Sequence, residues 1–120
     1  MAKIMLVDDD EDVRNTLARM LEGDGHEIVP AANGNEALDV LDKGEPLDLL
    51  LTDVIMPGLN GFNLARMART RRPRIKVLYL TGYHQQTVAL RDEGTKYGKL
   101  LIKPIRAADL RQEVNTALTS

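Results

Sequence analysis

The segment at residues 47–52 constrains the fold more than any other feature of this sequence. It reads LDLLLT, so four of its six residues are apolar and three leucines stand in a row, rather than apolar residues at every second position. A strand with one face in water alternates apolar and polar residues, whereas a strand buried on both faces does not. Strands of the second kind belong to parallel sheets covered by helices on both faces, so this segment predicts an α/β protein.

Short apolar runs and patterns of helical period alternate along the rest of the chain. Strands are expected at residues 3–7, 28–29, 47–52, 75–80 and 100–102, and helices around residues 13–21, 37–41, 62–68, 85–92 and 110–118. Glycine or proline follows most of these helices, as is usual where a helix ends. Five such units predict one five-stranded parallel sheet with helices on both of its faces.

The composition excludes several classes of protein. A chain of 120 residues fits a single domain, and we assign residues 1–120 to one. The absence of cysteine excludes a disulfide framework, a thiolate zinc site and a cysteine nucleophile. No apolar run approaches the ~20 residues that span a bilayer, and charged residues directly follow residues 1–7 where a secretory signal would continue. We therefore expect a cytoplasmic protein without membrane contact.

Charge is divided unevenly between the two halves of the chain. Residues 1–60 hold 14 acidic and 4 basic side chains, and residues 61–120 hold 4 and 12. Because the halves of a compact domain interleave, we expect an acidic site with basic groups beside it. The most basic stretch, residues 66–76, contains no aromatic residue for base stacking, and Arg and Lys are favoured at helix C-termini. It is interpreted as solvated surface, and no direct binding of nucleic acid is expected.

Reactive side chains gather where the predicted strands end. These strand ends carry Asp8-Asp9, Thr52-Asp53, Thr81-Gly82 and Lys103-Pro104. In an open parallel sheet, ligands bind beyond the carboxyl ends of the strands. Three crowded carboxylates predict a hard divalent cation such as Mg²⁺, which takes oxygen ligands. Together with an ammonium and a hydroxyl, they form a set of groups that suits a phosphoryl group in transfer.

With these residues, the sequence resembles the receiver domain of bacterial two-component response regulators. The resemblance covers nearly the whole chain. It rests on four pieces in order, each at a predicted strand end: Leu6-Val7-Asp8-Asp9-Asp10, then Leu51 to Gly58 with Gly61, Leu80-Thr81-Gly82, and Lys103-Pro104. It implies the flavodoxin-like strand order 2-1-3-4-5.

The resemblance also implies a metal site and a phosphoacceptor. Asp53 corresponds to the phosphoacceptor, a carboxylate nucleophile that forms an aspartyl phosphate. Asp8 and Asp9 correspond to the Mg²⁺ pair, with Asp9 the direct ligand and Asp8 acting partly through water. Asp53 and the main-chain carbonyl of Ile55 complete the protein's share of the metal ligands.

Two further residues and the partners follow from the same resemblance. Thr81 corresponds to the switch hydroxyl that moves onto a phosphoryl oxygen. Lys103 corresponds to the ion-pair partner of Asp53 and then of the phosphate, and the Lys103–Pro104 bond is often cis in the family. The implied donor is a histidine kinase or a histidine phosphotransfer protein. The output partner is unknown, and its surface is implied to be the fourth helix, fifth strand and fifth helix.

The sequence departs from the family pattern at positions that affect switching and phosphoryl lifetime. Leu100 stands three residues before the lysine, where most members have an aromatic, and Tyr97 or Tyr83 is a candidate substitute. Ile55 and Tyr83 flank the expected path of attacking water, and neither is a carboxylate or an amide. Since positioning of the water is much of the catalysis of hydrolysis, we expect slow self-dephosphorylation.

Other readings of the same residues lead to weaker functions. A binding-only pseudo-receiver is one alternative, but every key residue is present. A hydrolase of the haloacid dehalogenase type is another; it would use Asp10 as its second aspartate and a threonine where Asp12 stands. Asp10, Glu11 and Asp12 are better interpreted as the acidic start of the first helix. His26 and His84 lack partners at ligand spacing and are interpreted as loop or surface residues.

We expect a signalling module rather than an enzyme, since the implied chemistry acts on the protein's own aspartate. No output domain follows the last helix in this sequence. The start at Met1 favours an N-terminal or independent module, and the alternative is a receiver excised from a longer regulator or hybrid kinase.

Overall fold

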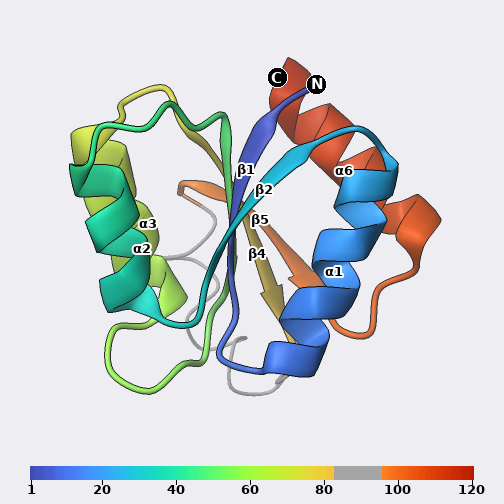
Figure 1. The fold of residues 1–120 in the computed structure, drawn as a ribbon, viewed down its shortest axis with the longest axis horizontal. Coiled ribbons are helices and arrows are strands. Elements are labelled where there is room, and N and C mark those ends of the chain that lie inside the picture. The colour runs from blue at the N-terminus through green and yellow to red at the C-terminus, as the bar shows by residue number, and fades with distance from the viewer. Residues whose placement is uncertain (83–95) are drawn as a thin grey trace.

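The computed structural model describes residues 1–82 and 96–120, and the described strands form one parallel sheet (Figure 1). The strands are β1 (Lys3–Val7), β2 (Glu27–Ala31), β3 (Leu49–Asp53), β4 (Lys76–Thr81) and β5 (Gly98–Ile102). The helices are α1 (Glu11–Gly23), α2 (Gly34–Asp42), α3 (Gly61–Arg71) and α6 (Ala107–Thr119). The strand order is β2-β1-β3-β4-β5, so the predicted α/β class and the order 2-1-3-4-5 are confirmed.

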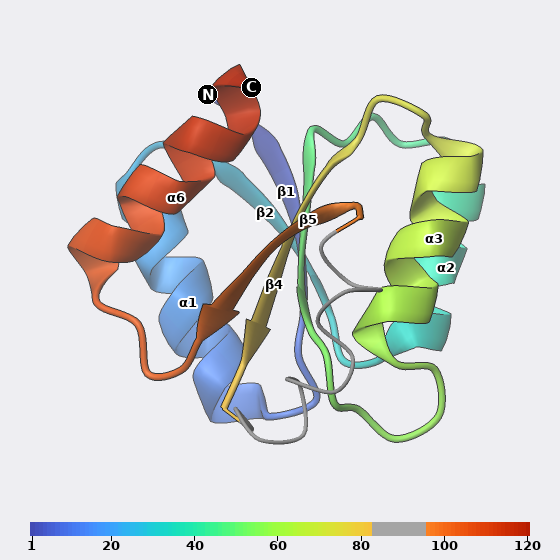
Figure 2. The same cartoon turned by 180° about the vertical axis from the view of Figure 1, so that it is seen from behind.

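Of the helices in the described residues, two cover each face of the sheet. Helices α2 and α3 lie on one side, and α1 and α6 lie on the other, as both views show (Figures 1 and 2). Side chains alternate between these layers, so that Leu50 packs under α2 and α3 while Leu49 and Leu51 pack under α1 and α6. The continuous apolar run of β3 therefore follows from burial on both faces.

Several element boundaries differ from those predicted. Strand β3 begins at Leu49 rather than at residue 47, because Asp48 lies at the strand entrance and bonds with Lys3. The N–H of Asp48 donates to the Lys3 carbonyl, and its Oδ2 accepts from the Lys3 N–H, both at 2.8 Å. Strand β5 begins two residues earlier than predicted, at Gly98, and β2 spans five residues instead of two.

Other expectations fall outside the described part of the chain. The predicted helix at 85–92 lies there, as do Tyr83 and His84. Within the described segments, no helix is long and apolar enough to cross a membrane.

The acidic start of α1 has the capping role predicted for it. The Asp10 side chain accepts from the main-chain N–H groups of Asp12 and Val13, at 3.0 and 3.2 Å. Glu11 and Asp12 occupy the first turn, where negative charge interacts favourably with the positive end of the helix dipole. These carboxylates therefore stabilise a helix end that points toward the carboxyl edge of the sheet.

Gly98 allows β5 to lie close against β4. A Cβ at this position would lie 1.8 Å from the carbonyl oxygen of Val77, far inside van der Waals contact. A side chain there would therefore push the two strands apart.

We expect Gly98→Ala to lower the free energy of unfolding by about 3 kcal/mol, near the upper end of overpacking costs. Urea denaturation followed by circular dichroism measures this change. The matched control is Gly23→Ala at the end of α1, where a Cβ meets no atom within 4 Å. That variant should be neutral or more stable by up to about 1 kcal/mol. Equal losses in both variants would contradict the steric explanation.

Candidate functional site

The carboxyl ends of β1, β3, β4 and β5 bring the predicted site residues to one edge of the sheet. Asp8 directly follows β1, Asp53 and Thr81 end β3 and β4, and Lys103 directly follows β5. Asp8, Asp53 and Thr81 are among the few buried polar residues, with exposed fractions of 1%, 6% and 0%. Buried polar groups of this kind need partners, so their contacts decide what the site can do.

Lys103 is the cation shared by two buried carboxylates. Its Nζ donates to Asp8 Oδ2 at 2.7 Å and to Asp53 Oδ2 at 3.3 Å. The main-chain N–H of Lys103 donates to the carbonyl of Thr81 at 2.7 Å, which joins the β5 end to the β4 end. The bond from Lys103 to Pro104 is cis, as the resemblance implied. An acidic cluster from the first half of the chain thus meets a base from the second half.

One oxygen of the predicted phosphoacceptor has no hydrogen-bond partner within residues 1–82 and 96–120. Asp53 Oδ1 is buried and accepts no hydrogen bond from any described residue. Ligand atoms of Asp8, Asp9 and Asp53 all lie within 4.8 Å of one another, and Asp9 is exposed. Three carboxylates, one of which has an oxygen that no described residue contacts, form a donor set that fits a hard cation such as Mg²⁺. The residues present therefore fit the predicted metal site.

The electrostatics of the site favour added positive charge. Burial raises the pKa of Asp53, the Lys103 charge lowers it, the Asp8 carboxylate raises it again, and the overall direction is upward. For Lys103, burial lowers the pKa, but bonds to Asp8 and the charges of both carboxylates raise it overall. One ammonium thus serves two buried carboxylates and leaves the pair short of positive charge.

Asp8 is held by contacts on its main chain and its side chain. Its N–H donates to the Ala31 carbonyl at 3.2 Å, and its Oδ1 accepts from the Asp10 N–H at 2.9 Å. Its carbonyl accepts from Nη1 of Arg14 at 2.7 Å. Sequence reasoning missed Arg14, because residue spacing places it on α1 but does not say where its guanidinium reaches.

The main chain at the end of β3 lies close to the first residue of α3. The Gly61 N–H donates to the Val54 carbonyl at 2.9 Å, and a Cβ on Gly61 would lie 2.2 Å from the Asp53 carbonyl oxygen. The buried Thr52 hydroxyl donates to that same carbonyl at 2.8 Å. Ile55 lies in the loop after β3 with its side chain against the core on the α2 and α3 side. Its main-chain carbonyl as a metal ligand stays a prediction.

Of the two candidate substitutes for the missing aromatic, Tyr97 lies away from Thr81, and Tyr83 lies outside the described residues. Tyr97 precedes Gly98, which is in register with Val77, whereas Thr81 is in register with Ile102 at the other end of β5. Four residues of strand span about 13 Å, so the ring lies far along the sheet from Thr81. Its contacts are with α3 instead: Arg69 donates to its carbonyl at 3.2 Å and lies 5.7 Å from its ring centroid.

Leu100 itself lies within β5, in register with Tyr79 of β4. It is partly buried and packs against the core on the α2 and α3 side. The position of the usual aromatic is thus filled by a packed aliphatic side chain.

The basic stretch at residues 66–76 makes structural contacts, in agreement with its interpretation as surface. Arg71 pairs with Asp42 at 2.7 Å, and Arg72 donates to the Leu41 carbonyl at 3.0 Å. Both lie at the end of α3, where positive charge is favoured. These two arginines tie α3 to α2.

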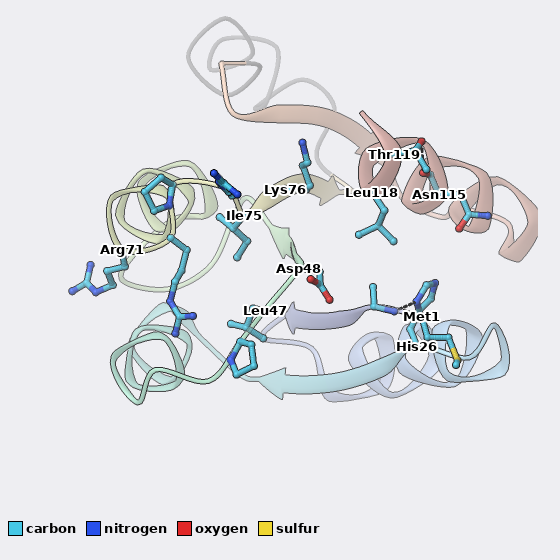
Figure 3. A pocket seen from close by; sticks show the side chains of 15 residues that line it. Met1, His26, Leu47, Asp48, Arg71, Ile75, Lys76, Asn115, Leu118 and Thr119 are labelled. Carbon is cyan, nitrogen blue, oxygen red and sulfur yellow. Dashed lines mark hydrogen bonds between the residues drawn. The ribbon is translucent and has the colours of Figure 1, made fainter.

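A hollow of about 830 Å³ lies at the opposite end of the sheet (Figure 3). Its lining comes from residues before the strands and from the ends of α3 and α6, and Asp48 points into it. His26 lines it with its Nδ1 bonded to the Ala2 N–H at 3.1 Å, which agrees with its interpretation as a loop residue. No residue of the acidic site lines this hollow, so its size does not mark the reactive end of the protein.

Comparison with known proteins gives one consistent result. The chain matches the family described as response regulator receiver domain over residues 4–115. It is 35% identical over 118 residues to the response regulator receiver protein CpdR of Brucella abortus, and the match covers 98% of each chain. It is 33% identical over 119 residues to the sensor kinase CckA of the same organism, where it spans 98% of this chain but 12% of the kinase.

Solved structures agree with the sequence matches. The response regulator TrrA of Thermotoga maritima, solved in complex with Mg²⁺ and BeF, superposes with a TM-score of 0.87 at 30% identity. The match covers 98% of this chain and 100% of that one. The similarity thus extends over the whole fold.

The raised pKa of Asp53 leads to a stability prediction with a definite sign. Its carboxyl binds a proton more tightly in the folded state, so its ionisation lowers stability as the pH rises above about 4. In EDTA at pH 7, we expect Asp53→Asn to raise the free energy of unfolding by on the order of 1 kcal/mol. The gain should fade as the pH falls below about 4. Urea denaturation across this pH range measures it.

The matched control is Asp8→Asn, which removes the same charge but breaks the closer ion pair with Lys103, at 2.7 Å compared with 3.3 Å for Asp53. It should lower stability, because that buried pair is the better formed of the two. Equal stabilisation by both variants would show a general effect of removing negative charge. It would contradict the explanation that the gain comes from the raised pKa of Asp53.

Proposed function

This chain belongs to the response regulator receiver domain family, and we propose that it accepts a phosphoryl group on Asp53 in a Mg²⁺-dependent reaction. The observation that carries this proposal is the buried Asp53 Oδ1, which has no partner among the described residues while Oδ2 is held by Lys103. A carboxylate fixed through one oxygen keeps the other available as a nucleophile.

The proposed transfer exchanges one bond to phosphorus for another. A lone pair of the Asp53 carboxylate forms the new P–O bond, and the P–N bond of a phosphohistidine on the donor breaks. Its electron pair leaves with the imidazole nitrogen, which takes up a proton. The donor is a histidine kinase or a histidine phosphotransfer protein, and the match to a sensor kinase supports a partner of this class.

Lys103 and Thr81 hold the phosphoryl group in this proposal. Lys103 already donates to both Asp8 and Asp53, so its ammonium can follow the negative charge from the carboxylate to the phosphoryl oxygens. Thr81 ends β4 at the same sheet edge and would donate its hydroxyl to one of those oxygens.

Asp8, Asp9 and Asp53, with the carbonyl of Ile55, would hold Mg²⁺. When bound, the ion supplies positive charge that reduces carboxylate repulsion and offsets charge on the phosphoryl oxygens. The complex of TrrA with Mg²⁺ and BeF supports this assignment. The shortage of positive charge around Asp53 supports it independently.

The output is a change in binding to a partner protein rather than turnover of a separate substrate. The surface that includes β5 and α6 is the proposed readout, with Leu100 in place of an aromatic switch residue. Neither a haloacid dehalogenase mechanism nor Asp10 as a catalyst is supported, because the Asp10 carboxylate caps α1.

The proposal is tested by intact-mass measurement after incubation with acetyl phosphate, with Mg²⁺ or with EDTA. We expect one phosphoryl group on the wild-type protein with Mg²⁺, and none with EDTA or on Asp53→Asn. An adduct on Asp53→Asn would contradict Asp53 as the acceptor. A wild-type protein that binds Mg²⁺ but takes no phosphoryl group from acetyl phosphate or a phosphohistidine donor would favour a binding-only receiver.

A second prediction concerns the lifetime of the phosphorylated state. Ile55 stands beside the proposed path of attacking water and offers no side-chain hydrogen bond. We expect Ile55→Asn to speed dephosphorylation about tenfold, since one added hydrogen bond to that water is worth about 1.4 kcal/mol. Loss of the phosphoryl mass over time measures the rate, with Ile55→Leu as an apolar control. Equal half-lives for the wild type and Ile55→Asn would contradict the idea.

A further inference from the structure

The proposed direct metal ligand Asp9 has no side-chain anchor in the part of the chain that the structure describes. Its carboxylate is exposed and makes no hydrogen bond or ion pair with residues 1–82 or 96–120. Asp8, in contrast, is held through both carboxylate oxygens by Asp10 and Lys103. The direction of the Asp9 side chain therefore depends on its main chain.

Arg14 controls that main chain directly. Its Nη1 donates to the Asp8 carbonyl at 2.7 Å, a short charge-assisted hydrogen bond. The peptide group from the Asp8 carbonyl to the Asp9 nitrogen is planar, so a contact that fixes the carbonyl also fixes where Asp9 leaves the strand end. Arg14 is partly buried on the first turns of α1, which are themselves anchored by the Asp10 cap.

Two effects of Arg14 on a bound cation have opposite signs. As a positive charge near the acidic cluster, the guanidinium repels a divalent cation and would weaken its binding. As a clamp on the Asp8–Asp9 peptide, it preorganises a ligand and would strengthen the binding. Groups that orient metal ligands typically contribute 10- to 100-fold in metal affinity. A partly exposed charge is screened by solvent and salt, so orientation should dominate.

We propose that Arg14 is a positioning residue of the metal site, which aims the Asp9 carboxylate at Mg²⁺ by holding the Asp8 carbonyl. This role rests on the proposed function, because it presupposes that the acidic cluster binds Mg²⁺. Through Arg14, α1 would then contribute to metal binding, in addition to being capped by Asp10.

The test is calorimetric titration of the metal-free protein with MgCl₂ at constant ionic strength. We expect Arg14→Met to raise the Kd for Mg²⁺ about tenfold. Arg14→Lys keeps the charge and one donor and should recover part of the affinity. In metal-free protein, the Asp9 amide signal in ¹H–¹⁵N spectra should shift in Arg14→Met, while signals of β2 stay in place and show that the fold is intact.

The matched control is Arg111→Met, which removes the same charge from an exposed arginine on α6 that pairs with Asp24 at the end of α1. It should leave the Kd close to the wild-type value. A Kd in Arg14→Met equal to or below that of the wild type would overturn the proposal, because loss of charge alone lowers it. A wild-type protein that does not bind Mg²⁺ would instead remove the proposed function on which the inference rests.

Discussion

The ammonium of Lys103 makes the burial of two carboxylates possible. Asp8 and Asp53 are almost fully excluded from water, and a buried charge without a partner is among the most costly features a fold can contain. The cation comes from the end of β5, and β4 lies between β5 and the strands that carry the acids. The site is therefore complete only when β5, the outermost strand, is in place. Folding and site assembly are one event.

The same arrangement leaves the site electrostatically incomplete. One ammonium faces two carboxylates, and an oxygen of Asp53 is buried without a donor among the described residues. A fully satisfied network would be more stable but less reactive, because every oxygen would already have a partner. The two hydrophobic layers on either side of the sheet offset the free energy that this unsatisfied site costs the fold.

Residue order was sufficient to predict which side chains meet, because parallel strands end on a common side of the sheet. That rule alone brings together the Asp8, Asp53, Thr81 and Lys103 positions, and the apolar run before Asp53 predicts the covered sheet. Contacts of long side chains do not follow from such rules, which is why the Arg14 contact with Asp8 was missed.

Strand starts were also misjudged, because they depend on packing between neighbouring strands. Gly98 extends β5 toward its N-terminus through its close approach to Val77, and this extension places Tyr97 far along the sheet from Thr81. Asp48 shortens β3 through its bonds with Lys3, a contact between residues that are distant in sequence. Neither effect has a signature in local residue patterns.

Both chain ends lie together at the end of the sheet where β1 begins (Figures 1 and 2), whereas Asp53 is the last residue of β3 at the other end. Polypeptide joined at either end would thus leave from the end of the sheet that is remote from the acidic cluster. This geometry makes the unit portable, since it can be spliced into larger architectures without rebuilding its reactive edge. It offers a physical reason why similar sequence makes up 98% of CpdR but 12% of the sensor kinase CckA.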